Sequence, residues 1–154
     1  MAWAFVSGRT EPSLRARAMR FLARREHSRL ELRRKLAAIA GEGDDVDAVL
    51  EELATQGWLS DARFAEQSIR ARSRRHGPLR LVHDLRAKGV GEETIAAAFH
   101  AAGEEGEADI EKVWRSRFKA PPAGERERAR QVRFLQGRGF PLDAALKFIK
   151  GVKT

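Results

Sequence analysis

The chain repeats one helical pattern three times at intervals of about fifty residues, which restricts it to an array of small helical modules. In each copy, one pair of residues spaced four apart is followed by a second pair with the same spacing. The second pair begins ten residues after the end of the first pair, or thirteen residues after it in the first copy. The three extra residues of the first copy fall within 38–45. The aligned positions are Leu32, Leu36, Val49 and Leu53, then Leu81, Leu85, Ile95 and Phe99, then Gln131, Leu135, Ala145 and Ile149.

The size of these modules determines how they must be organised. A unit of roughly 50 residues buries little core by itself, so the units must pack on one another or on a partner. Leucine and alanine dominate the apolar residues and no alternating strand pattern occurs, which favours helix over sheet. We expect an all-α fold of three tandem three-helix repeats, each resembling a helix-turn-helix. The expected divisions are a flexible tail over residues 1–11 and repeats over 12–59, 60–103 and 104–154.

Local signals place several helix ends. Ser28 and Glu31 have the spacing of a capping box, and Gly77-Pro78 has the pattern of a cap followed by the first helical residue. Pro12 is expected in the first turn of the first helix. In the third repeat, one helix face should run through Ile110, Val113, Trp114 and Phe118 until the break at residues 121–124.

Charge alternates in the same register as the repeat. The net charge of successive segments is +7 for residues 1–41, −7 for 42–61, +6 for 62–88, −7 for 89–111 and +9 for 112–154. Each module therefore has one basic and one acidic element. Arginine supplies 23 of the 30 basic residues, and its planar guanidinium suits phosphate or carboxylate. With an isoelectric point near 10.7, nucleic acid, or a protein bound to it, ranks high among the expected partners.

The sequence offers little for catalysis or metal binding. Cysteine is absent, and the four histidines lack zinc spacing, so we interpret them as surface or cap residues. Gly89-Val-Gly91 and Gly137-Arg-Gly139 are interpreted as helix stops rather than phosphate-binding loops. No nucleophile and base stand out. We expect no enzyme, no cofactor and no metal; because neither a signal peptide nor a membrane span is recognisable, we expect a cytoplasmic protein.

Arginine stripes are the candidate binding residues. Like charges one helical turn apart destabilise a helix slightly, and their recurrence in three modules suggests an anionic partner. The competing interpretation is a solvated face whose charge is relieved by the acidic third helix of each module. The candidates are Arg20, Arg24, Arg25, Arg29, Arg33, Arg34 and Lys35 in the first repeat, Arg70, Arg72, Arg74 and Arg75 in the second, and Arg126, Arg130 and Arg133 in the third.

Two tryptophans stand at module ends. Trp58 and Trp114 are expected to pack in a core or between modules rather than to stack on bases. Gln131 is a polar residue at a register position that is apolar in the other two copies.

The order and spacing of several short segments resemble the RecX family of recombination regulators, from about Arg15 to Gly151. The segments are Arg17-Ala-Met-Arg-Phe-Leu22, His27-Ser28, Glu31-Leu-Arg-Arg-Lys-Leu36, Gly57-Trp-Leu-Ser-Asp-Ala-Arg-Phe-Ala65, Gly77-Pro78, Leu85-Arg-Ala-Lys-Gly-Val90 and Arg133-Phe-Leu-Gln-Gly-Arg-Gly-Phe140.

The resemblance implies an elongated, curved array of three three-helix modules. It also implies binding to the RecA recombinase as a filament on single-stranded DNA, where the protein meets the strand directly or through the filament. We expect the protein to be a monomer. Such a regulator suppresses ATP hydrolysis, strand exchange and the co-protease activity that triggers the SOS response. It catalyses nothing and binds no membrane. Arginine stripes would meet phosphate or acidic patches on the recombinase.

The alternative is a stand-alone basic helical DNA-binding module, since three-helix units with arginine-rich helices also suit helix-turn-helix recognition. Sequence-specific binding to duplex DNA without recombinase would distinguish the two.

Overall fold

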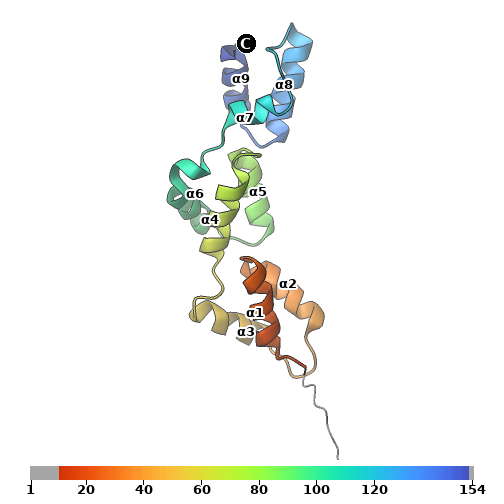
Figure 1. Ribbon diagram of the computed structural model, residues 1–154, viewed down its shortest axis with the longest axis vertical. Coiled ribbons are helices and arrows are strands. Elements are labelled where there is room, and N and C mark those ends of the chain that lie inside the picture. The colour runs from red at the N-terminus through yellow and green to blue at the C-terminus, as the bar shows by residue number, and fades with distance from the viewer. Residues whose placement is uncertain (1–10, 153–154) are drawn as a thin grey trace, which may run out of the picture. The chain divides into compact units, whose positions relative to one another are not determined.

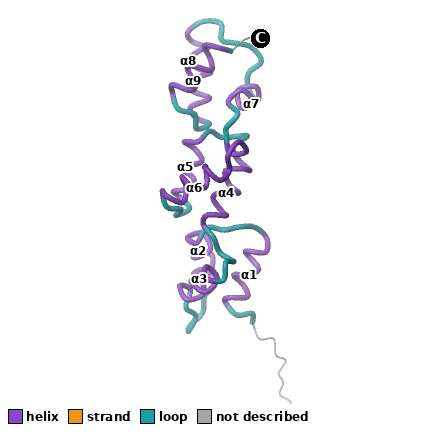
Figure 2. The backbone as a smooth tube through the Cα atoms, turned by 90° about the vertical axis from the view of Figure 1, so that its left-hand side faces the viewer, coloured by secondary structure: helices purple, strands orange, loops and turns teal. Residues whose placement is uncertain are grey.

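The computed structural model describes residues 11–152, and over this range it contains α-helices and no strand (Figures 1 and 2). The prediction of an all-α fold is confirmed. Residues 1–10, most of the expected flexible tail, lie outside the described residues. The helices are α1 (Leu14–Arg24), α2 (Arg29–Ile39), α3 (Val46–Thr55), α4 (Asp61–Arg72), α5 (Pro78–Ala87), α6 (Glu92–Ala102), the 3-10 turn η1 (Gly103–Gly106), α7 (Ile110–Arg115), α8 (Glu125–Gly137) and α9 (Leu142–Gly151).

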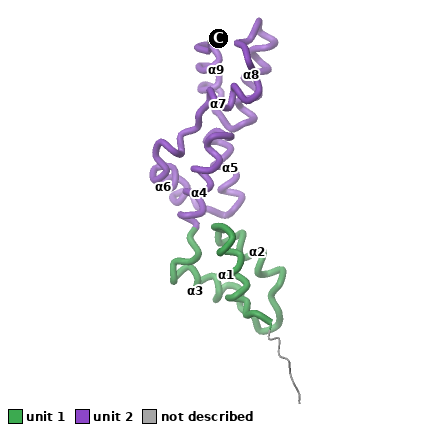
Figure 3. Tube along the Cα trace, in the orientation of Figure 1, with its two compact units in different colours: residues 1–60 green, residues 61–154 purple. Residues whose placement is uncertain are grey.

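The helices form three groups of three, and the chain divides into two compact units, residues 1–60 and 61–154 (Figure 3). The first unit holds α1 to α3 around a leucine-rich core. In the second unit, α4 packs on α6, and α8 packs on α9. Each group buries its own cluster, which includes most of the register positions: Leu32, Leu36 and Leu53 in the first; Leu85 and Ile95 in the second; Leu135, Ala145 and Ile149 in the third. Val49 and Phe99, also register positions, are only partly buried, and their neighbours Leu50 and Ala98 are buried instead.

The helix ends follow the local signals closely. The Ser28 hydroxyl accepts from the Glu31 N–H in a complete capping box, and Pro78 is the first residue of α5 after Gly77. Ser13 caps α1, so Pro12 lies just outside the helix rather than in its first turn. The expectation for the third repeat was wrong in one respect, because α7 ends at Arg115. Phe118 still joins the core of that repeat, from the turn that follows the helix.

Trp114 and Gln131 form a buried polar pair in the third repeat. Trp114 is 2% exposed and Gln131 is 1% exposed. The Trp114 Nε1–H donates to the Gln131 Oε1 at 2.9 Å, and the Gln131 Nε2 donates to the Ala120 carbonyl at 3.2 Å. The glutamine therefore occupies an apolar register position because it satisfies an indole N–H that burial removes from water. Trp58 differs: it is 52% exposed, so the expectation of core packing is wrong for this residue.

The second and third repeats meet backbone to backbone. The Gly77 N–H donates to the Arg138 carbonyl at 2.6 Å, and the Leu79 N–H donates to the Gly139 carbonyl at 2.9 Å. A Cβ on Gly77 would lie 2.6 Å from the Gly139 carbonyl carbon, and one on Gly139 would lie 2.5 Å from the Arg80 Cβ. Gly139 also has φ +101°. We call this contact the Gly77–Gly139 junction, and it explains why these two repeats form one compact unit.

Candidate nucleic-acid interface

Two candidate arginines of the first repeat form ion pairs with the acidic helix beside them. The Arg29 Nη2 lies 3.1 Å from the Glu51 Oε2, and the Arg33 Nη2 lies 3.4 Å from the Asp47 Oδ2. All four side chains are well exposed, so each pair contributes less than about 1 kcal/mol. For these two residues, the geometry fits the competing interpretation, in which the acidic α3 relieves a basic surface.

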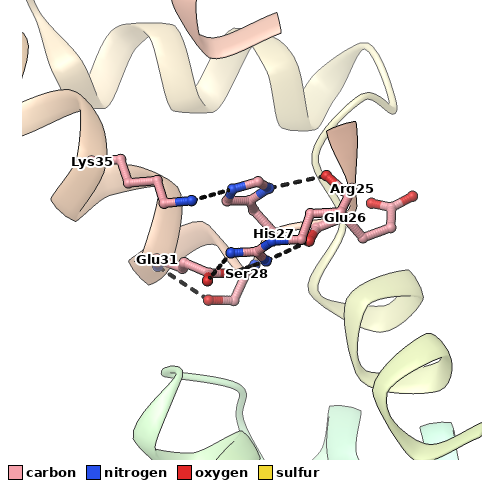
Figure 4. A network of polar contacts seen from close by, with 6 residues as sticks. All are labelled: Arg25, Glu26, His27, Ser28, Glu31 and Lys35. Atoms are coloured by element: carbon pink, nitrogen blue, oxygen red, sulfur yellow. Dashed lines mark hydrogen bonds and ion pairs between the residues drawn. The ribbon is translucent and has the colours of Figure 1, made fainter. Parts of the chain in front are cut away.

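Arg25 and Lys35 belong to a polar network at the turn between α1 and α2 (Figure 4). The guanidinium of Arg25 donates to both carboxylate oxygens of Glu31, at 3.1 and 2.7 Å. The Lys35 Nζ donates to the His27 Nε2 at 2.8 Å, and the His27 Nδ1–H donates to the Arg25 carbonyl at 3.0 Å. The Lys35 Nζ also lies 5.1 Å from the centroid of the Phe21 ring. Both cations therefore stabilise this turn, Lys35 from a half-buried position and Arg25 from the surface.

His27 is 1% exposed, so its interpretation as a surface or cap residue is wrong. Burial lowers the pKa of His27, the Arg25 carbonyl raises it in part, and the charges of Arg25 and Lys35 lower it further. Protonation would place a second N–H against the Lys35 ammonium, so the neutral ring is the form that fits. His27 therefore contributes stability that is present above its ordinary pKa and is lost as the pH falls toward the lower folded value.

Lowering the pH from about 8 to 5 should therefore destabilise the first unit, because the unfolded chain takes up a proton on His27 that the folded chain resists. His76 has a pKa lowered by burial and by Arg72, Arg80 and Arg138, and should act with the same sign on the second unit. The measurement is the unfolding free energy of the wild type and of His27→Gln against pH. The unfolding free energy of His27→Gln should depend less on pH than that of the wild type. Parallel profiles would contradict the assignment.

Two arginines of the second repeat are also held internally. Arg70 pairs with Glu66 on its own helix and with Glu105, at 2.9 and 3.0 Å. Arg72 donates to Asp84 on α5. Burial raises the pKa of Asp84, but the hydrogen bond from Arg72 and the charges of Arg72 and Arg80 outweigh it, so the net shift is downward. Arg72 thus joins α4 to α5.

The third repeat carries its candidate arginines along α8. Arg126, Arg130 and Arg133 line a shallow pocket of about 470 Å³ with Glu127. Arg130 lies 3.3 Å from the carboxylate of Glu127 and 5.5 Å from the centroid of the Phe118 ring, so it packs against its own helix and core.

Half of the candidate residues remain exposed and form no ion pair with an acidic residue between positions 11 and 152. Three are in the first repeat, two in the turn after α4, and two on α8. They are Arg20, Arg24, Arg34, Arg74, Arg75, Arg126 and Arg133. Unpaired guanidinium groups in three modules are the feature of this surface that an anionic partner would satisfy.

The structure adds two cations that sequence reasoning missed. Lys112 on α7 and Arg138 at the end of α8 line a pocket of about 480 Å³ with Arg74 and Arg75. The only signal in the sequence was Gly137-Arg-Gly139, which was interpreted as a helix stop. That interpretation holds, because Arg138 caps α8 and Gly139 has φ +101°, but the same residues also form the junction.

Over the described residues, no cluster of histidine, aspartate or glutamate side chains has the arrangement of a metal site. Nor is any described helix both long enough and apolar enough to span a bilayer.

Family models match nearly the whole chain. The RecX first three-helix domain matches residues 15–53, the second matches 60–98 and the third matches 104–149. The curated relatives include "Regulatory protein RecX" of Ralstonia pickettii, which is 42% identical over 90% of this chain and 87% of its own length. The protein of the same name from Herbaspirillum seropedicae is 48% identical over 83% of each chain.

Solved structures share the fold. A crystal structure of RecX from Lactobacillus salivarius matches with a TM-score of 0.71 at 17% identity, over 90% of this chain and 96% of that one. A crystal structure of a regulatory protein RecX matches with the same score at 21% identity, over 90% of this chain and 72% of that one. At these identities the likeness is evidence of the fold alone.

Proposed function

Because the chain belongs to the RecX family of regulatory proteins, we propose that it is a negative regulator of the RecA recombinase. It binds the RecA filament on single-stranded DNA and inhibits ATP hydrolysis, strand exchange and co-protease activity. Through these it modulates recombination, DNA repair and the SOS response. It acts in the cytoplasm as a monomer and performs no catalysis.

The observation that carries this proposal is the set of exposed arginines that have no acidic partner within residues 11–152. The chain contains enough carboxylates to neutralise many of its arginines, and it does so at Arg29, Arg33, Arg70 and Arg72. Arg74 and Arg75 remain exposed beside the junction. A filament offers both a phosphate backbone and protein carboxylates, and either would satisfy these cations in a salt-dependent manner.

The test is RecA ATP hydrolysis on single-stranded DNA, titrated with this protein at moderate salt. We expect inhibition well below one copy per recombinase subunit. The variant Arg74→Glu/Arg75→Glu should need about thirtyfold more protein for half-inhibition, because two reversed charges at about 1 kcal/mol each, at a partly screened contact, cost about 2 kcal/mol together. Arg70 and Arg72 are left unchanged because their reversal would break internal pairs.

The matched control is Lys119→Glu/Lys150→Glu, which changes the net charge equally. Both lysines are exposed in the third repeat, and neither lines the pocket that contains Arg74 and Arg75. This control should inhibit like the wild type. Equal inhibition by both variants would contradict the role of the arginines. No inhibition by the wild type, together with tight binding to duplex DNA, would instead support the stand-alone DNA-binding module.

A further inference from the structure

Four cations from two repeats surround one concave pocket within the second unit. Arg74 and Arg75 come from the turn after α4, Lys112 comes from α7, and Arg138 ends α8. Val113 and Ser116 complete the lining, and the volume is about 480 Å³. We call it the basic pocket.

The Gly77–Gly139 junction brings these cations together. Arg75 lies two residues before Gly77, whose N–H donates to the carbonyl of Arg138 itself. The guanidinium of Arg138 lies 5.1 Å from the centroid of the Phe134 ring, which limits the directions it can take. The main-chain bonds of the junction therefore hold the backbone of Arg138 close to the turn that carries Arg75.

No carboxylate within residues 11–152 forms an ion pair with any of the four cations. Acidic residues do line a neighbouring pocket that shares Arg74 and Lys112. They are Glu104, Glu105, Glu107 and Asp109; Glu105 pairs with Arg70, and the Asp109 carboxylate accepts from the Lys112 backbone N–H. The lowered pKa of nearby His76, due to burial first and then to Arg72, Arg80 and Arg138, is consistent with a positive potential here.

We propose that the basic pocket binds one phosphodiester group of a single strand of DNA, directly and across the joint between the second and third repeats. A pocket lined by cations from three elements suits a compact tetrahedral anion, and guanidinium groups bind phosphate oxygens in pairs. At Arg29 and Arg33, in contrast, one carboxylate meets one arginine on an open surface. The inference rests on the proposed function in that the filament supplies the strand.

The experiment measures binding of the full chain to a fluorescent oligothymidylate by anisotropy, over a range of salt concentrations. Lys112→Gln/Arg138→Gln should weaken binding by about tenfold, the effect of losing roughly 1.4 kcal/mol. The slope of log K against log salt should become shallower by about 0.7, the value for one phosphate of a single strand. Lys119→Gln/Lys150→Gln removes the same charge outside the pocket and should stay within about twofold of the wild type. Arg138→Lys should retain more affinity than Arg138→Gln.

Three results would overturn the inference. They are an absence of single-strand binding by the wild type, equal losses in the two double variants, and a Lys112→Gln/Arg138→Gln protein that keeps its DNA affinity but no longer inhibits the recombinase. The last would make the pocket a contact for protein carboxylates. If the double variant fails to fold, Lys112→Gln alone carries the test, since that side chain is exposed.

The two proposals can fail separately. A wild type that does not inhibit RecA, but whose pocket variants lose single-strand affinity as described, would reject the proposed function and keep the pocket. Inhibition of RecA by the wild type, together with unchanged DNA binding in the pocket variants, would keep the proposed function and reject the pocket.

Discussion

Replacing Trp114 by alanine should lower the unfolding free energy of the third repeat by about 3–5 kcal/mol, the range for removing a large buried aromatic side chain. Trp114 is 2% exposed, and its ring contacts those of Phe118 and Phe148 at centroid distances of 6.3 and 5.8 Å. The loss combines apolar burial, a cavity in the core and the unpaired Gln131 amide. The measurement is native-state hydrogen exchange at the buried amides of α8, which reports the local free energy of opening.

Trp58→Ala is the matched control, because Trp58 is 52% exposed and its removal should change stability by no more than about 0.5 kcal/mol. Gln131→Leu tests the polar part separately. It leaves the Trp114 indole N–H without its acceptor, at a cost of about 1–3 kcal/mol, whereas Trp114→Phe/Gln131→Leu removes both partners and should cost less than the sum of the single changes. Equal losses for Trp58→Ala and Trp114→Ala would contradict the core assignment.

Gly139→Ala should destabilise the second unit by about 3 kcal/mol, the sum of backbone strain and a steric clash that relaxation only partly relieves. The strain arises because φ at Gly139 is +101°, where a side chain is disfavoured. The clash arises because the new Cβ would lie 2.5 Å from the Arg80 Cβ and 2.6 Å from the Arg80 backbone nitrogen. The measurement is urea unfolding of the full chain, together with hydrogen exchange at the Gly77 and Leu79 amides.

Two other glycines separate these causes. Gly124 has φ +99° but open space around its Cβ position, so Gly124→Ala should show the strain alone. Gly77 does not have a positive φ, yet its Cβ would lie 2.6 Å from Gly139 backbone atoms, so Gly77→Ala should show the clash alone. Protection of the Leu79 amide should fall in Gly77→Ala and Gly139→Ala and persist in Gly124→Ala. Equal protection in all three would show that the junction does not hold the repeats together.

Much of the fold could be predicted because its determinants are local or periodic. The repeat register identified Leu32, Leu36, Leu85 and Leu135, and all are buried. Helix ends were predictable to within a residue or two where a cap or proline marks them, as at Ser28, since capping depends on neighbours along the chain.

The candidate site was less predictable because pairing depends on which acidic side chain folding brings near each arginine. Arg33 and Arg34 are adjacent in sequence, yet Arg33 pairs with Asp47 and Arg34 remains exposed. Burial of His27 follows from its packing beside Phe21 and Lys35, which no short motif encodes. The basic pocket requires Arg75 and Arg138 to meet, and only the tertiary contact at the junction brings them together.

The two sides of the junction are also made at different times during synthesis of the chain. The donors at Gly77 and Leu79 are made roughly sixty residues before their acceptors at Arg138 and Gly139. Domains tend to fold from the amino terminus as they leave the ribosome. The second repeat would therefore keep these two main-chain amides without their acceptors until Arg138 and Gly139 have been made. A polypeptide that ends before Arg138 would retain the arginines of its first two repeats but could not complete this joint.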